Sequence, residues 1–154
     1  MPGCRRGFEE SIRTGLLIGA PVRGLRAVVV DGAYHAVDSS ELAFRNCAVE
    51  AFREAYERAG PVVLEPFMRV QAETPEEFQG AVFGLLQRRR AEIVGTDRAE
   101  TGLMRVEGLA PLSEMFGFST ALRSATQGRA EFGMEFGEYR PAPREIASRL
   151  IATH

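Results

Sequence analysis

The sequence contains no lysine, and this absence limits the electrostatic contacts that the protein can make. All 19 positive charges are arginines, so a phosphate-binding loop of the GxxxxGK[ST] type is excluded. Any phosphate contact must use the planar, forked guanidinium group instead. Acidic residues number 21 and bring the net charge to −2, so overall charge does not indicate a nucleic-acid partner.

Cysteines and long apolar runs are also scarce. Cys4 and Cys47 are far apart and lack metal-ligand spacing, and we expect Cys47 to be a small core residue on the apolar side of a helix. No apolar run reaches the roughly 18 residues needed to cross a bilayer, and the N-terminus lacks the apolar core of a secretory signal. These features predict a cytoplasmic protein with no membrane partner.

Motifs that carry catalysis are absent as well. The sequence holds no GxSxG, HExxH or CxxC, and its histidines are only His35 and His154. Most carboxylates fall on predicted helix surfaces or caps. We therefore expect no catalytic residue, no metal site and no cofactor in this chain.

What is present is a globular pattern, with 45% hydrophobic and 26% charged residues. The first third predicts a short helix over residues 7–14, a strand over 22–30 that ends in an apolar run, and a helix over 39–59. Asp38 is expected to cap that helix, with Glu41 as its capping-box partner.

The chain from Pro66 onward reads as a second unit, and the interruption at Glu65 and Pro66 marks the domain boundary. A capping box at Thr74–Glu77 is expected to open its first helix, which Gly80 and Gly84 would bring close to a sheet. The predicted strands span residues 67–73, 91–95, 102–109 and 129–139, and the helices span 75–89, 111–127 and 144–152. This order predicts an α+β fold, the ferredoxin-like split βαβ, with both inner helices on one face of an antiparallel sheet.

Two arginine-bearing segments are candidate binding sites in this second unit. Arg88, Arg89 and Arg90 end a helix, where they either complement the helix dipole or contact phosphate. Residues 123–129 surround the next helix end, where their side chains either satisfy helix carbonyls or hold a nucleic-acid backbone; the candidates are Arg123, Ser124, Gln127 and Arg129. The aromatic rings of Phe116 and Phe118 are expected in the core.

A third candidate is the tip between the predicted strand and helix of the first unit. Asp31 and Gly32 favour a tight turn, which exposes Tyr34 and His35. Turn chemistry alone accounts for most of these residues. The alternative is a tip whose aromatic ring and imidazole touch a partner.

Taken together, these residues resemble the C-terminal part of elongation factor G, the translational GTPase that drives ribosomal translocation. The matching segments keep the family's order and spacing: DGAYHAVDSSELAF (31–44), PVVLEPFMRVQAETPEEFQG (61–80), the arginine run at 88–90, and APLSEMFGFSTALRSATQGRAEFGMEFGEY (110–139). The resemblance implies that residues 1–64 are a truncated βαβ remnant of domain IV. It implies that residues 65–154 are the ferredoxin-like domain V with its C-terminal helix.

The resemblance also implies a set of partners. Domain IV reaches the decoding region of the ribosome, where its tip follows tRNA and mRNA; the tip positions carried over are Tyr34 and His35, with Asp38 and Ser39 shaping the loop. Domain V contacts rRNA of the large subunit, which fits the arginine segments. The GTPase domain would be a further partner, and GTP and magnesium would be bound only by a full-length parent factor.

The sequence departs from the family in ways that leave alternatives open. The GTPase, barrel and third domains are absent, as are the first strands of domain IV with the Gly-rich half of its tip. Ala91 stands where the family usually has glycine. The alternatives are a free-standing interaction module with an exposed sheet edge, a recycling-type factor, or a ribosome protection protein. We expect residues 1–20 to be poorly ordered, or the edge to be buried against another chain.

Overall fold

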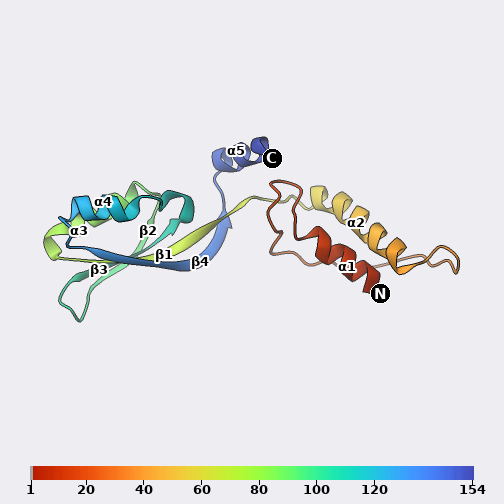
Figure 1. Ribbon diagram of the computed structural model, residues 1–154, viewed down its shortest axis with the longest axis horizontal. Coiled ribbons are helices and arrows are strands. Elements are labelled where there is room, and N and C mark those ends of the chain that lie inside the picture. Colours follow the sequence, from red (N-terminus) through yellow and green to blue (C-terminus); the bar gives the residue numbers. More distant parts are fainter. Residues whose placement is uncertain (1) are drawn as a thin grey trace. The chain divides into compact units, whose positions relative to one another are not determined.

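The computed structural model describes residues 2–154, which form two compact units (Figure 1). The first unit runs to Val63 and includes residues 142–154, and the second spans Leu64–Pro141. Residues 142–154 were expected in the second domain, but their contacts place them in the first unit. The backbone N–H of Ala142 donates to the carbonyl of Val63 at 2.9 Å. The terminal helix α5, Arg144–Thr153, follows directly.

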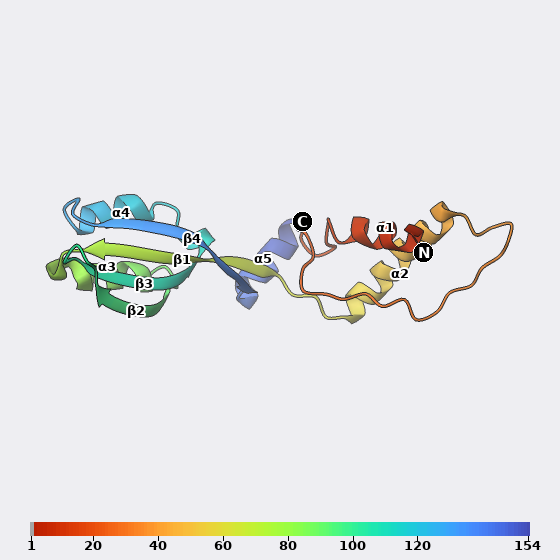
Figure 2. The same cartoon turned by 90° about the horizontal axis from the view of Figure 1, so that it is seen from below.

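The second unit is a four-stranded antiparallel sheet in the order β2-β3-β1-β4. Its strands are β1 (Leu64–Thr74), β2 (Glu92–Arg98), β3 (Met104–Pro111) and β4 (Glu131–Pro141). The helices α3 (Gln79–Gln87) and α4 (Phe118–Ala125) lie on one face of the sheet (Figures 1 and 2). The predicted α+β, split βαβ arrangement is therefore confirmed.

The core lies between this sheet and its two helices. Along β1, Val70, Ala72 and Thr74 are fully buried, whereas the alternate residues Arg69 and Gln71 are exposed. The helices complete the core with Val82, Leu85, Leu86, Phe118 and Leu122. The period-two alternation thus divides the sheet into a face that α3 and α4 cover and an open face that neither of these two helices covers.

Both helices of this unit begin later than predicted. A 3₁₀ turn, η1 (Glu76–Phe78), precedes α3, and the hydroxyl of Thr74 caps nothing because it is buried without a hydrogen-bond partner. A second turn, η2 (Leu112–Glu114), and a left-handed residue, Gly117 with φ of 72°, precede α4. The expected capping box at Thr74 is therefore wrong.

The first unit is built on α1 (Pro2–Ser11) and α2 (Glu41–Arg58), which pack closely side by side. A Cβ atom on Gly3 would lie 2.5 Å from the carbonyl oxygen of Glu41, and one on Gly7 would overlap the carbonyl oxygen of Arg45. Glycine is thus needed where these two backbones meet. The close approach expected of Gly80 is wrong, since its Cβ would meet nothing within 4 Å.

Several expectations for the first unit are corrected. Residues 22–30 form no strand: Val28, Val29 and Val30 are 64%, 65% and 91% exposed. No strand among residues 2–154 pairs with them, and a strand requires a partner ladder.

Three further predictions for this unit are wrong: the N-cap of α2, the burial of Cys47 and the disorder of the first residues. The N-cap of α2 is Ser40, whose hydroxyl accepts from the N–H of Ala43 at 3.1 Å, rather than Asp38. Cys47 is exposed rather than part of a core. The segment where disorder was expected holds α1, and only Met1 lies outside the described residues.

Candidate nucleic-acid interface

The tip loop between residues 31 and 39 is closed by a reciprocal pair of hydrogen bonds. The N–H of His35 donates to the hydroxyl of Ser39 at 2.7 Å, and the N–H of Ser39 donates to the carbonyl of His35 at 3.0 Å. Asp31 accepts locally from the N–H of Gly32 at 2.7 Å. These bonds shape the backbone and leave the side chains of Tyr34, His35 and Asp38 exposed.

The arginine run at the end of α3 divides into three different roles. The side chain of Arg88 is exposed, and its guanidinium group forms no hydrogen bond or ion pair with the described residues. Arg89 donates to the carbonyls of Glu114 and Phe116 and lies over the ring of Phe118, with 5.4 Å between its Cζ and the ring centre. It therefore ties the end of α3 to the start of α4.

Arg90 is bound to Glu65, a carboxylate that is only 7% exposed. Two guanidinium nitrogens donate to it, at 2.6 and 3.2 Å. The hydrogen bonds with Glu65 raise the pKa of Arg90 above its ordinary value. The backbone of Arg90 is in the left-handed conformation, with φ of 57°. Only Arg88 of the three is thus available to an external phosphate.

The segment 123–129 divides in the same way. Arg123 and Ser124 are exposed, and Arg123 has no ion-pair partner among residues 2–154. Arg129 forms an ion pair with Glu77, and its guanidinium lies over the ring of Phe78. Gln127 lies in a turn with a positive φ of 53°, and its side chain is exposed. Arg123, Ser124 and Gln127 are therefore the accessible members.

The two arginine segments lie at opposite ends of the helix layer. Arg129 reaches Glu77, which precedes α3, whereas Arg89 reaches Phe116, which precedes α4. The two helices therefore run antiparallel, and Arg88 and Arg123 end up at opposite ends. The third candidate, Tyr34 and His35, belongs to the other unit. The two arginine segments are thus separate contact points rather than a single cluster.

One exposed aromatic residue was missed by sequence reasoning. Phe116 was expected in the core, but it is 78% exposed, while Phe118 is fully buried. The left-handed Gly117 between them turns the two rings apart, and this glycine was the available signal. Arg89 fixes the Phe116 carbonyl at the Arg88 end of the layer, so an exposed aromatic ring and a free guanidinium belong to the same end. Such a pair suits stacking on an unpaired base and contact with phosphate.

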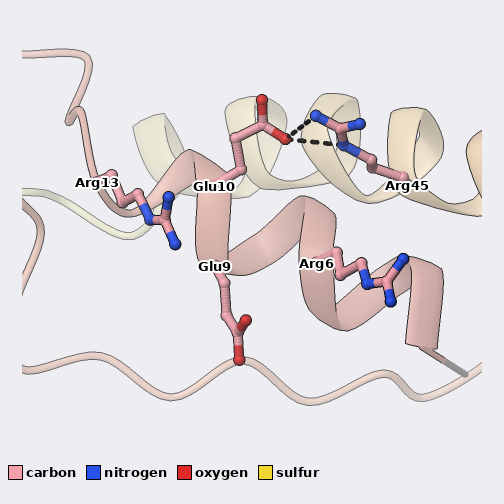
Figure 3. Close-up of a pocket in the computed structure, with 5 residues that line it drawn as sticks. All are labelled: Arg6, Glu9, Glu10, Arg13 and Arg45. Atoms are coloured by element: carbon pink, nitrogen blue, oxygen red, sulfur yellow. Dashed lines mark hydrogen bonds and ion pairs between the residues drawn. The ribbon is translucent and has the colours of Figure 1, made fainter.

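A shallow pocket of about 310 Å³ also lies between α1 and α2 (Figure 3). Its lining carries both signs of charge: Arg6, Glu9, Glu10, Arg13 and Arg45. Two nitrogens of Arg45 donate to one oxygen of Glu10, at 2.6 and 2.8 Å. Three arginines against two glutamates leave a net charge of only +1 on the lining, so it offers an anion a weak attraction.

Neither a metal site nor a membrane span is found among residues 2–154. No group of three or more histidine, cysteine, aspartate or glutamate side chains in this range is arranged to hold a metal ion. None of the helices in the range is both long and apolar enough to cross a membrane.

Comparison with known proteins matches both parts of the chain to one family. The family model described as elongation factor G, domain IV, matches residues 1–60, and the one described as elongation factor G C-terminus matches residues 62–150. Elongation factor G 1 of Syntrophus aciditrophicus is 54% identical over 151 residues, which cover 97% of this chain and 21% of that protein.

Further relatives agree. Elongation factor G 1 of Treponema pallidum is 52% identical, over 98% of this chain and 22% of its own length. A crystal structure from Thermus thermophilus superposes with a TM-score of 0.91 at 37% identity, over 99% of this chain and 23% of that one. The chain spans about a fifth of the length of these relatives. It therefore belongs to the elongation factor G family, across the parts described as domain IV and the C-terminus.

Proposed function

We propose that this chain is the ribosome-binding C-terminal module of an elongation-factor-G-like factor that promotes movement of tRNA and mRNA during protein synthesis. The observation that carries the proposal is the succession of the two family matches, over residues 1–60 and 62–150. By sequence, residues 1–64 then correspond to part of domain IV and 65–154 to domain V, although the contacts of residues 142–154 group them with the first unit. The module itself performs no chemistry. In a full-length parent factor, the GTPase domain would belong to the same polypeptide and would bind GTP and magnesium in the cytoplasm.

The contact points of the helix layer support the binding part of this proposal. Arg88 and Arg123 carry guanidinium groups with no ion-pair partner among the described residues, and Phe116 offers an exposed ring. A free guanidinium forms strong, charge-assisted hydrogen bonds to phosphate oxygens. We therefore assign rRNA contact to these three side chains. Arg89, Arg90 and Arg129 act as positioning residues within the domain.

Cosedimentation with ribosomes across a salt series tests this assignment. The test variants are Arg88→Gln and Arg123→Gln, and the control is Arg69→Gln, which removes the same charge from an exposed ion pair with Glu135 on the open face of the same sheet. We expect both test variants to bind more weakly and with a shallower salt dependence than the control. Absence of binding by the unaltered chain at low salt, or equal binding by all three variants, would contradict the proposal.

The tip is tested in a full-length factor, where translocation is measurable. His35 is held by its backbone through Ser39, so replacing its exposed side chain leaves the loop closed. We expect His35→Ala to slow translocation more than GTP hydrolysis, because the imidazole would contact the tRNA–mRNA complex. Ser39→Ala removes the hydroxyl that closes the loop and should act in the same direction. Equal loss of both activities, or of neither, would exclude a role of the tip.

A second candidate function is a free-standing interaction module. The exposure of Val28, Val29 and Val30 favours it, since an extended apolar segment invites pairing with another strand. A recycling-type factor or a ribosome protection protein would share the same domains. The genomic reading frame tests the free-standing module, because an upstream in-frame GTPase domain excludes it.

A further inference from the structure

The open face of the sheet carries a surplus of negative charge. The strand register places seven accessible carboxylates on it against three arginines, a net charge of −4: Glu73, Glu92, Asp97, Glu107, Glu131, Glu135 and Glu138, with Arg69, Arg105 and Arg140. Glu65, the register partner of Arg140, is not counted, because it is buried and paired with Arg90. Within residues 64–141, the charged residues outside this set are five carboxylates and six arginines, a net charge of +1. The negative charge of the domain is thus concentrated on the open face, whereas the unpaired Arg88 and Arg123 lie in the helix layer of the opposite face.

All three arginines of the open face are already engaged by its carboxylates. Arg69 pairs with Glu135 at 3.1 Å. Arg105 pairs with Glu73 at 3.1 Å and with Asp97 at 3.5 Å. These ion pairs neutralise Arg69 and Arg105, and the face still holds further carboxylates.

Arg140 is engaged in the same manner on the other side of the face. It binds Glu138 and Glu92, at 2.5 and 2.8 Å, and these hydrogen bonds, that to Glu92 foremost, raise its pKa. Its guanidinium also lies over the ring of Phe67, 4.9 Å from the ring centre. Glu107 and Glu131 remain without an ion-pair partner among the described residues.

The unpaired Glu107 lies in the middle of a row that crosses all four strands. The register aligns Gly95 of β2, Glu107 of β3, Gln71 of β1 and Gly133 of β4. Both glycines end the row in open space, since a Cβ atom on either would meet nothing within 4 Å. The row therefore offers a carboxylate and an amide at its centre, with uncovered backbone at each end, between two charged rows.

We infer that the open face binds a basic, arginine- or lysine-bearing polypeptide segment laid across the strands at this row. A cationic side chain would complete the ion pairing of Glu107 and Glu131, and Gln71 offers an amide oxygen and N–H groups to a backbone. A phosphate backbone is disfavoured here, because the carboxylate surplus repels it. The open face is thereby assigned to protein, whereas the helix layer is assigned to RNA under the proposed function.

The test measures fluorescence anisotropy of a labelled decapeptide of alternating arginine and glycine with the full chain at low salt. Glu107→Gln and Glu131→Gln should each weaken binding about two- to fivefold, as expected for exposed charge pairs, and added salt should weaken it further. The matched control is Glu57→Gln on α2, which removes the same charge from an exposed residue of the other unit. Gly133→Arg should abolish binding, because it places a cation in the row at a site with room for a side chain.

Amide chemical-shift perturbations locate the bound peptide. We expect them on the central strands around Gln71 and Glu107. Equal affinity of Glu107→Gln, Glu131→Gln and the Glu57→Gln control, or perturbations confined to α3 and α4, would overturn the inference. Displacement of the peptide from these strands by an oligouridylate of the same length would also overturn it. Failure of ribosome cosedimentation would leave this result standing, since the peptide assay contains no ribosome.

Discussion

At the scale of single residues, the fully buried threonines Thr74 and Thr126 differ in their hydrogen bonds. The hydroxyl of Thr126 donates to the carbonyl of Leu122 at 2.7 Å and accepts from the N–H of Ala130 at 3.3 Å, whereas that of Thr74 has no partner. We expect Thr74→Val to stabilise the protein by about 1 kcal/mol, because it removes an unpaired buried hydroxyl. Thr126→Val should destabilise it by about 1–2 kcal/mol. Urea denaturation measures both, and loss of stability in both variants would contradict this account.

Arg90 and Gln127 have a left-handed backbone although neither is glycine. Replacing each with glycine should change the free energy of unfolding in opposite directions. Gln127→Gly should stabilise the protein by about 1 kcal/mol, since it relieves the positive φ of 53° and removes no bond of the side chain. Arg90→Gly relieves a φ of 57° but leaves the buried Glu65 unpaired, with a net loss of about 1–3 kcal/mol. Denaturant midpoints compare the two, and a gain in both would show that Glu65 does not need its partner.

The site residues show what a sequence can predict at this scale. The arginine segments and the tip were identified from residue type, and the structure adds which side chains are free. That distinction depends on tertiary partners: Arg90 is removed from the candidates by Glu65, a residue 25 positions earlier in the chain. Phe116 was missed because periodicity assigns both rings to one helix, and a single left-handed glycine separates them.

At the scale of elements, the contact between α1 and α2 depends on the absence of a side chain at Gly7. We expect Gly7→Ala to destabilise the first unit by about 1–3 kcal/mol, because the new methyl group would overlap the carbonyl oxygen of Arg45. Gly80→Ala in α3 is the matched control. Its Cβ meets nothing within 4 Å, so alanine should stabilise α3 by about 1 kcal/mol through helix propensity. Thermal unfolding followed by far-ultraviolet circular dichroism measures both, and equal effects would exclude close packing as the cause.

The elements of the second unit were predicted in type and order because its turns and alternation are local signals. Its sheet is self-contained, so each strand finds its partner within residues 64–141. The apolar run at residues 22–30 has the composition of a strand, yet strand formation depends on a partner elsewhere. The two expected caps failed for different reasons: Ser40 offers the same chemistry as Asp38 two residues later and caps α2 instead, whereas Thr74 is buried in the sheet with no hydrogen-bond partner.

At the scale of the whole molecule, the two units differ in how much apolar surface they bury. The large core cluster belongs entirely to the second unit, while the first contributes Phe52 and Val63 as buried apolar side chains. Native-state hydrogen exchange should therefore find the slowest amides in β1 and β3, and amides of residues 22–38 should exchange almost without protection. Protection of residues 25–30 that rises with protein concentration would instead reveal pairing of this segment with another chain.

The exposed thiol of Cys47 makes the arrangement of the two units measurable. Both cysteines lie in the first unit, and the second contains none. A maleimide dye directed to Cys47, with Cys4 replaced, would mark α2 alone. A cysteine introduced at Ser113 or Ser119, both exposed, would then take the second dye of an energy-transfer pair. The distance distribution between the two labels would report whether the units hold one orientation or several, and whether a ribosome selects among them.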